Sequence, residues 1–171
     1  EIIGSTLRRA GTILAHHKVS LEIDANLPML DIDPVLFEQA LFNLLDNAAK
    51  YAPLETTISI RGWRDGQFLA VQIIDEGEGI PRSELESVFD KFYRAQKGDH
   101  VRPGTGLGLA ISRGFVEAMH GTISADNRAD RSGACRRRRR LADLPARDPS
   151  AAPRRGRAAD DRVVRVQLQQ L

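Results

Sequence analysis

The sequence predicts a two-layer α/β sandwich of the α+β class, in which helices cover one face of a mixed sheet. Segments with a helical apolar period and short strand-like segments follow in the order helix, strand, helix, two strands, helix, helix, strand. A turn signal at Asp65-Gly66 joins the two consecutive strands as a hairpin. The chain has 171 residues, 42% of them apolar, which suffices for one domain with a core.

The first elements are a helix, a strand and a long second helix. Residues 3–17 carry apolar side chains at helical spacing, and residues 19–24 alternate apolar and polar side chains, as a half-buried strand does. Asp33 and Pro34 form an N-cap and first-turn pair, so we expect a helix from Pro34 to about residue 52.

The later elements follow from the same patterns. We expect strands at 56–63, 68–75 and 122–127, a short helix at 82–95, and an amphipathic helix at 107–120 that ends at Gly121.

The composition changes after residue 135. Five consecutive arginines begin a segment rich in Arg, Ala, Pro and Asp, and no aromatic residue follows Phe115. We therefore expect a domain at residues 1–135 and a disordered tail at 136–171, whose abrupt loss of pattern is typical of a shifted reading frame or a divergent terminus. One alternative stays open, in which residues 163–168 supply the last strand of the sheet.

The bulk properties exclude several classes of protein. A net charge of +2 gives no strong indication of nucleic-acid binding, and the single cysteine, Cys135, excludes an internal disulfide framework and fits a reducing compartment. No apolar run approaches the ~20 residues of a membrane span. Because the chain starts at Glu1, we expect a fragment of a longer protein whose missing part could carry a membrane anchor.

The long helix carries a polar stripe on an otherwise apolar surface. Gln39, Asn43, Asn47 and Tyr51 lie four residues apart, and Lys50 lies beside them. Taken alone, the stripe is explained as well by a solvent-facing surface as by a ligand. Buried amides need polar partners, so a ligand would explain why two asparagines occupy this helix.

Two glycine-rich loops are further candidates. In DEGEGIP (75–81), Asp75 ends a strand, and its carboxylate could accept a hydrogen bond from an amine such as that of adenine. GTGLGLA (104–110) opens a helix, whose free N–H groups favour an anion. Each could equally be an ordinary turn or loop, and neither is a Walker A loop.

Together, four segments resemble the N, G1, F and G2 boxes of the histidine-kinase ATP-binding domain. They are residues 43–51, 75–79, 89–95 and 104–108, in that order. This family, which includes ATPases of the gyrase, Hsp90 and MutL types, would account for residues 1–135. The sequence as a whole, and not any single motif, is most similar to the Kdp-type, potassium-responsive sensor kinases.

The resemblance implies ATP and Mg²⁺ as cofactors and gives roles to individual residues. Asn47 would ligate Mg²⁺, and Asn43 would contact the metal or the phosphates. Asp75 would bind the adenine amine. Lys50 and Arg94 would bind the negatively charged phosphates. The remaining nucleotide contacts would come from Tyr51, Gly77, Gly79, Ile80, Phe92, Gly104, Thr105, Gly106, Leu107 and Gly108. A mobile lid would span residues 96–108.

The implied activity is that of a protein histidine kinase, catalytic domain only. It would present the γ-phosphate of Mg-ATP to a histidine on a separate dimerisation domain, for transfer to a response regulator, on the cytoplasmic side of the bacterial inner membrane. In hydrolysing relatives the position of Asn43 holds a glutamate that activates water, so the amide implies slow hydrolysis. We expect His16 and His17 to be surface residues, which leaves no phosphoacceptor in this chain.

Other readings remain open at the level of sequence. An anti-sigma-type serine kinase or a hydrolysing ATPase would share the same boxes. A nucleic-acid-binding protein could use the arginines of the tail, 136–140, 154, 155 and 157, although no aromatic residue interleaves them.

Overall fold

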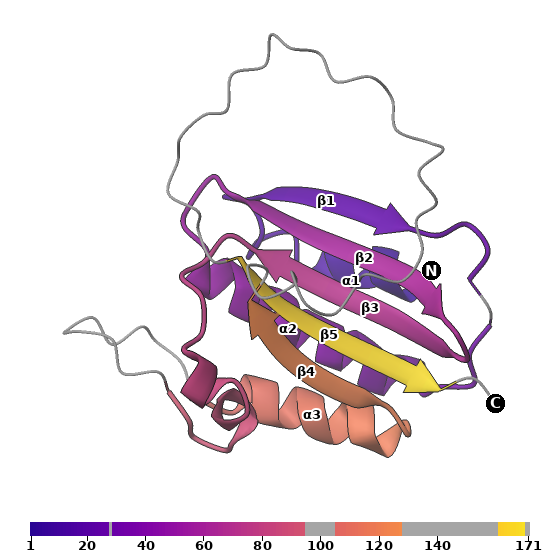
Figure 1. The fold of residues 1–171 in the computed structure, drawn as a ribbon. Helices are drawn as coiled ribbons and strands as arrows, with labels where there is room; N and C mark the ends of the chain where they lie inside the picture. The colour runs from indigo at the N-terminus through magenta and orange to yellow at the C-terminus, as the bar shows by residue number, and fades with distance from the viewer. Residues whose placement is uncertain (28, 95–104, 128–160, 170–171) are drawn as a thin grey trace, which may run out of the picture.

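The structure is a computed structural model that describes residues 1–27, 29–94, 105–127 and 161–169 (Figure 1). Its elements are α1 (Ile2–Arg9), β1 (Lys18–Ile23), α2 (Pro34–Tyr51), β2 (Thr57–Asp65), β3 (Phe68–Asp75), the 3₁₀ turns η1 (Arg82–Glu84) and η2 (Ser87–Phe89), α3 (Gly108–Ala118), β4 (Thr122–Asn127) and β5 (Arg162–Gln169).

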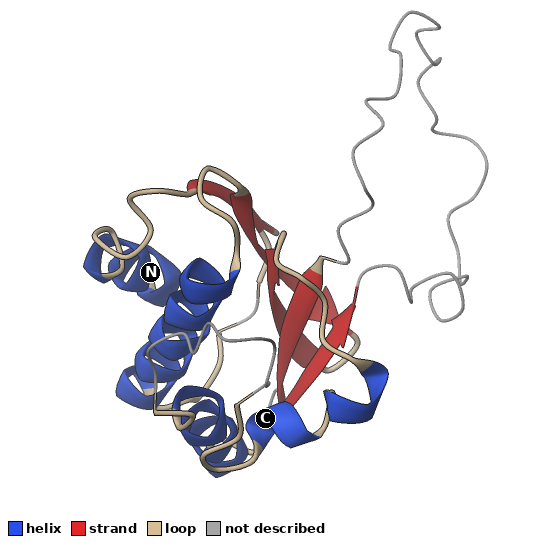
Figure 2. Cartoon of the chain, turned by 90° about the vertical axis from the view of Figure 1, so that its left-hand side faces the viewer, coloured by secondary structure: helices blue, strands red, loops and turns tan. Residues whose placement is uncertain are grey.

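The strands form one mixed sheet in the order β1-β2-β3-β5-β4. β1 pairs with β2 in parallel, and the other neighbours are antiparallel. Figure 2 shows the three α-helices on one side of this sheet. The predicted class, a two-layer sandwich with helices on one face of a mixed sheet, is confirmed.

The core lies between the sheet and α2. Asp33 caps this helix as predicted, because its Oδ1 accepts hydrogen bonds from the N–H groups of Val35 (2.8 Å) and Leu36 (3.1 Å). The buried face of α2 recurs at helical spacing and comprises Phe37, Ala40, Leu41, Leu44, Leu45 and Ala48. It packs against the inward side chains of the central strands.

The predicted hairpin forms, one residue later than expected. Asp65 pairs with Phe68, so the turn consists of Gly66 and Gln67. Gly66 has φ +66°, a conformation that glycine adopts without strain, which explains why the glycine begins the turn.

The prediction of a helix at 3–17 was too long. α1 ends at Arg9, and turns follow, because Gly11 and Thr12 are weak helix formers. His17 is not a plain surface residue: its Nε2 lies 3.2 Å from the carbonyl oxygen of Ala49, which ties this segment to α2.

Strand β1 is more exposed than its alternation predicts. Val19 and Leu21 are 42% and 50% exposed. β1 is the edge strand and has a neighbour, β2, on one side only, so a period of two does not bury either face.

The segment 82–94 is not the single short helix that the sequence suggests, because η1 and η2 are separate turns of three residues each. The end of α3 also differs from the prediction. His120, not Gly121, takes the left-handed conformation, with φ +57°. The N–H groups of His120 and Gly121 bond to the carbonyls of Glu117 and Val116, which is a Schellman ending.

Gly121 is needed for a different reason, namely space. A Cβ at this position would lie 2.6 Å from the carbonyl oxygen of Gln167 and 2.8 Å from Leu168 Cδ2, both in β5. The end of α3 therefore packs directly on the last strand.

The segment expected to be a disordered tail supplies a central strand. β5 lies between β3 and β4, with Val164, Val166 and Leu168 in the core. This is the alternative in which residues 163–168 complete the sheet, and it leaves no gap between β3 and β4. Residues 136–160, including the arginine run, lie outside the described residues, so the predicted domain boundary at residue 135 stays a prediction for them.

Gly121→Ala should lower the free energy of unfolding by about 1–3 kcal/mol, because the added methyl group meets backbone of β5. Gly114→Ala is the matched control: it lies in α3 with open space around it, and should raise stability by about 0.5–1 kcal/mol. Urea unfolding of both variants checks this, and equal stabilities would contradict the placement of β5 against α3.

Candidate functional site

Four elements meet where α2 and β3 end, β5 begins and β4 ends. Asp75 is the last residue of β3, and Arg162 is its direct partner in the first position of β5. Arg162 Nε donates to Asp75 Oδ1 at 2.9 Å, and both side chains are more than nine-tenths buried. The Arg162 guanidinium also lies over the ring of Tyr51 at the end of α2, 4.7 Å from its centre.

The loop after β3 folds back on the Asp75 carboxylate. The Gly77 N–H donates to Asp75 Oδ1 at 2.9 Å. A Cβ on Gly77 would lie 2.6 Å from that oxygen, 2.9 Å from Arg162 Nε and 3.0 Å from the Tyr51 carbonyl oxygen. Only glycine fits here, so the predicted importance of Gly77 has a steric cause.

Burial raises the pKa of the Asp75 carboxyl above its ordinary value of 3.8. The loss of water around the charge outweighs the attraction of Arg162 and the hydrogen bond from Gly77, which act in the opposite direction. A carboxylate in such a place is costly to keep for packing alone, which makes it a candidate for binding a ligand.

Asn127, which the sequence analysis did not single out, fixes the rest of this loop. Its Oδ1 accepts from the Ile80 N–H at 2.9 Å, and its Nδ2 donates to the Ile80 carbonyl at 2.7 Å. The side-chain amide thus pairs with Ile80 as a neighbouring strand would. The only signal in the sequence was an asparagine at the end of a predicted strand, which is too common to be informative.

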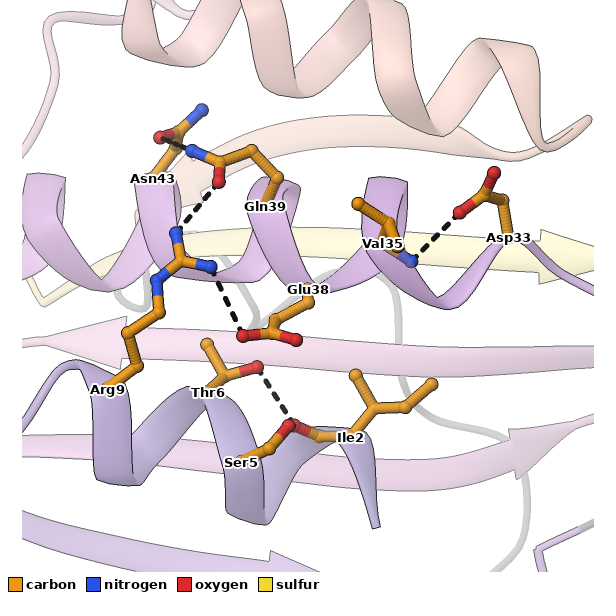
Figure 3. A network of polar contacts seen from close by, with 9 residues as sticks. All are labelled: Ile2, Ser5, Thr6, Arg9, Asp33, Val35, Glu38, Gln39 and Asn43. Carbon is orange, nitrogen blue, oxygen red and sulfur yellow. Dashed lines mark hydrogen bonds and ion pairs between the residues drawn. The ribbon is translucent and has the colours of Figure 1, made fainter.

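The first two residues of the polar stripe of α2, Gln39 and Asn43, belong to a network of polar contacts that reaches α1 (Figure 3). Arg9 of α1 donates to Gln39 Oε1 at 2.7 Å and pairs with Glu38 at 3.1 Å. Gln39 Nε2 in turn donates to Asn43 Oδ1 at 3.2 Å. One of the two lone pairs of the Asn43 oxygen is therefore engaged, and the Nδ2 group of Asn43 is a donor that suits a phosphate oxygen and not a metal ion.

The other stripe residues are at least partly accessible. Asn47 is half-buried, one turn beyond Asn43, and Tyr51 is 36% exposed. Lys50 pairs with Asp46 at 2.5 Å and keeps 45% of its side chain exposed. The stripe therefore runs along α2 and ends at the Asp75–Arg162 pair, through Tyr51.

The second glycine-rich loop touches the segment predicted as the F box. The Phe92 N–H donates to the Gly106 carbonyl at 3.0 Å, and both residues have positive φ, +65° and +69°. A Cβ on Gly106 would lie 2.8 Å from the Tyr93 carbonyl oxygen. Tyr93 donates to Glu84, and burial with this bond raises the pKa of its phenol to about 12.

The remaining predicted residues are placed as follows. Arg94, Thr105 and Gly108 are exposed, Gly79, Ile80 and Leu107 are half-buried, and Gly104 lies outside the described residues with most of the predicted lid. The structure thus brings Tyr51, Asp75 and Gly77 together, and separately Phe92 and Gly106.

No group of three or more His, Cys, Asp or Glu side chains that could hold a metal occurs within the described residues. The polar donors near α2 are amides instead. A single amide fits an ion whose other ligands are water and nucleotide phosphates, as is usual for Mg²⁺. None of the helices in the described part of the chain is long and apolar enough to cross a membrane.

Comparisons with known proteins show the family to which the chain belongs. A sequence profile described as the histidine kinase-, DNA gyrase B- and HSP90-like ATPase family matches residues 32–142. The sensor protein KdpD of Escherichia coli K12 is 40% identical over 135 residues, which are 79% of this chain and 15% of that protein. KdpD of Clostridium acetobutylicum is 36% identical over 129 residues, 75% of this chain and 14% of that protein. The predicted resemblance to Kdp-type sensor kinases is confirmed.

Solved structures support the fold. The mycobacterial sensor histidine kinase MprB superposes with a TM-score of 0.72 at 24% identity, covering 98% of this chain and 91% of that one. The nucleotide-free catalytic domain of histidine kinase ThkA gives 0.71 at 19% identity, covering 99% and 92%. The chain spans about one seventh of the KdpD proteins that it matches.

The raised pKa of Asp75 predicts a stability that falls as the pH rises. The folded chain holds the Asp75 proton more tightly than the unfolded chain, so this contribution is full below pH 3.8 and is lost as the pH rises through the folded pKa. Asp75→Asn cannot titrate. The unfolding free energy of the wild type minus that of the variant should therefore decrease from pH 3 upward and then level off. A difference that increases with pH would mean that Arg162 outweighs burial.

Proposed function

Because this chain belongs to the family of histidine kinase-, DNA gyrase B- and HSP90-like ATPases, we propose that it is the ATP-binding catalytic domain of a two-component sensor histidine kinase. The whole protein would respond to potassium, as the resemblance to Kdp-type sensor kinases implies, and would lie at the bacterial inner membrane through segments outside this chain. The domain would act with a dimerisation domain and a response regulator.

The observation that carries the proposal is the buried carboxylate of Asp75. It lies at the end of β3 and accepts a hydrogen bond from the Gly77 N–H, and the Arg162 guanidinium that pairs with it lies over the ring of Tyr51. A carboxylate accepts hydrogen bonds, and the 6-amine of adenine is a matching donor. Asn127 would hold the far part of this loop in place through Ile80.

The triphosphate would extend from there along the stripe of α2. Asn47 would ligate Mg²⁺ through its amide oxygen. Asn43, whose oxygen accepts a hydrogen bond from Gln39, would donate its Nδ2–H to a phosphate oxygen. Arg9 positions Gln39 and so acts on Asn43 indirectly. The remaining negative charge of the phosphates would be neutralised by Lys50, Arg94 and the backbone N–H groups of Gly106, Leu107 and Gly108.

The chemistry would be transfer rather than hydrolysis. Asn43 is an amide and cannot take a proton from water, so no general base stands at this position. The domain would neutralise the triphosphate and orient its γ-phosphate toward a histidine of the dimerisation domain, whose imidazole nitrogen attacks the phosphorus while ADP leaves. Mg²⁺ would supply charge neutralisation during this step.

Asn47→Ala should weaken ATP binding about tenfold or more when Mg²⁺ is present and hardly at all in EDTA, because the amide acts through the metal. Isothermal titration calorimetry measures both conditions. Asn26→Ala, in the exposed loop after β1, is the matched control and should bind as the wild type does. An equal loss with and without Mg²⁺ would place Asn47 on the nucleotide itself.

Asn43→Glu should raise steady-state phosphate release by at least about tenfold over Asn43→Gln, since it alone adds a proton acceptor of matched length. The wild type should release phosphate slowly, and labelled ATP should leave no acid-labile phosphate on the chain itself. Rapid hydrolysis by the wild type would favour the hydrolysing ATPase, and stable self-labelling would mean that one of its own histidines accepts the phosphate.

A further inference from the structure

Arg162 has more hydrogen-bonding capacity than the protein uses. It lies at the start of β5 with its side chain 8% exposed, and its Nε donates to Asp75 Oδ1. Its Nη2, however, is buried and has no hydrogen-bond partner within the described residues. A buried donor without an acceptor is unfavourable and uncommon, so it calls for an explanation.

The rigid shape of the guanidinium fixes where this free donor points. The Nε–H bond and one Nη2–H bond lie parallel on the same edge of the planar group. Because Nε–H points at Asp75, the neighbouring Nη2–H points the same way, alongside the carboxylate. Both hydrogen bonds that Asp75 makes in the described part of the chain end on Oδ1, which leaves Oδ2 for another donor.

The surroundings suit a flat heterocycle. Tyr51 stacks against the guanidinium at 4.7 Å, and the Gly77 backbone packs closely on the pair and donates to Asp75 Oδ1, so Oδ2 is the oxygen that a ligand would use. An acceptor, Asp75 Oδ2, thus stands next to a donor, Arg162 Nη2, beside an aromatic ring. The edge of a 6-aminopurine offers the complement, a donor on the 6-amine next to an acceptor at ring nitrogen N1.

We propose that Arg162 is a second residue that recognises the base in the nucleotide site. Its Nη2 donates a hydrogen bond to the purine N1, while Asp75 accepts a hydrogen bond from the 6-amine. This assignment rests on the proposed function as an ATP-binding domain. It makes β5, the strand from the arginine-rich end of the chain, a part of the site as well as of the sheet.

The experiment compares ADP with 1-deaza-ADP, in which a C–H replaces N1 and the 6-amine remains. Titration calorimetry of the whole chain gives both dissociation constants for the wild type, Arg162→Lys and Arg165→Lys. Lysine keeps the charge beside Asp75 but ends near the guanidinium carbon, so it places no donor at Nη2. Arg165 is the matched control in the same strand, stacked on Trp63 at 5.3 Å and away from Asp75.

The wild type and Arg165→Lys should bind ADP about tenfold more tightly than 1-deaza-ADP, the size expected for one hydrogen bond from a charged donor. Arg162→Lys should bind the two nearly equally. The ratio of two constants measured on one preparation does not depend on how much of it is folded, so poor folding cannot imitate this result.

Two results would overturn the assignment while leaving ATP binding intact. One is an unchanged ADP preference in Arg162→Lys. The other is tighter binding of both nucleotides by this variant, which would mean that Arg162 competes with the base for Asp75. Absence of ADP binding to the wild type would overturn the proposed function together with this inference.

Discussion

The fold depends on the pairing of β5 with two neighbours at once. Among the described strands, β4 joins the sheet only through β5, and only β5 covers the inner edge of β3. Val164, Val166 and Leu168 enter the core that α2 and α3 close from the other side. Asp75 stands opposite Arg162, and a shift of one residue would turn every side chain of β5 to the other face. The ion pair and the apolar pattern therefore specify the same register.

That register also decides where the site lies. The end of β3, the start of β5 and the end of β4 lie side by side at one end of the strands. Asp75, Arg162 and Asn127 therefore come together there. The end of α2 arrives at the same place and brings Tyr51. The polar stripe of α2 then extends away from this corner, and its first residues, Gln39 and Asn43, are held by hydrogen bonds that start from Arg9 in α1. In the proposed function, the base end and the phosphate end of the nucleotide site thus follow from how four elements terminate.

Local signals in the sequence were sufficient to predict several of these structural features. The cap at Asp33, the turn at Gly66 and the stripe of α2 are properties of neighbouring residues, and the structure has them nearly as predicted. The failures concern distant partners. Exposure of Val19 depends on which strand lies at the edge, and the amide pair between Asn127 and Ile80 spans 47 residues. The space that Gly121 leaves free is filled by β5, about which the local pattern of α3 says nothing.

The misjudged tail shows why average composition is a weak guide to a strand. Eight residues suffice for β5, and within them the two arginines occupy places where a guanidinium is tolerated. Arg165 lies over Trp63 with its charge half-exposed, and Arg162 meets a carboxylate and an aromatic ring. Burying Arg162 is unfavourable unless its donors are satisfied, and its Nη2 has no partner within the described residues. The residue that lets an arginine-rich segment close the sheet is thus the residue that lacks an acceptor there, and in the proposed function a bound purine would provide one.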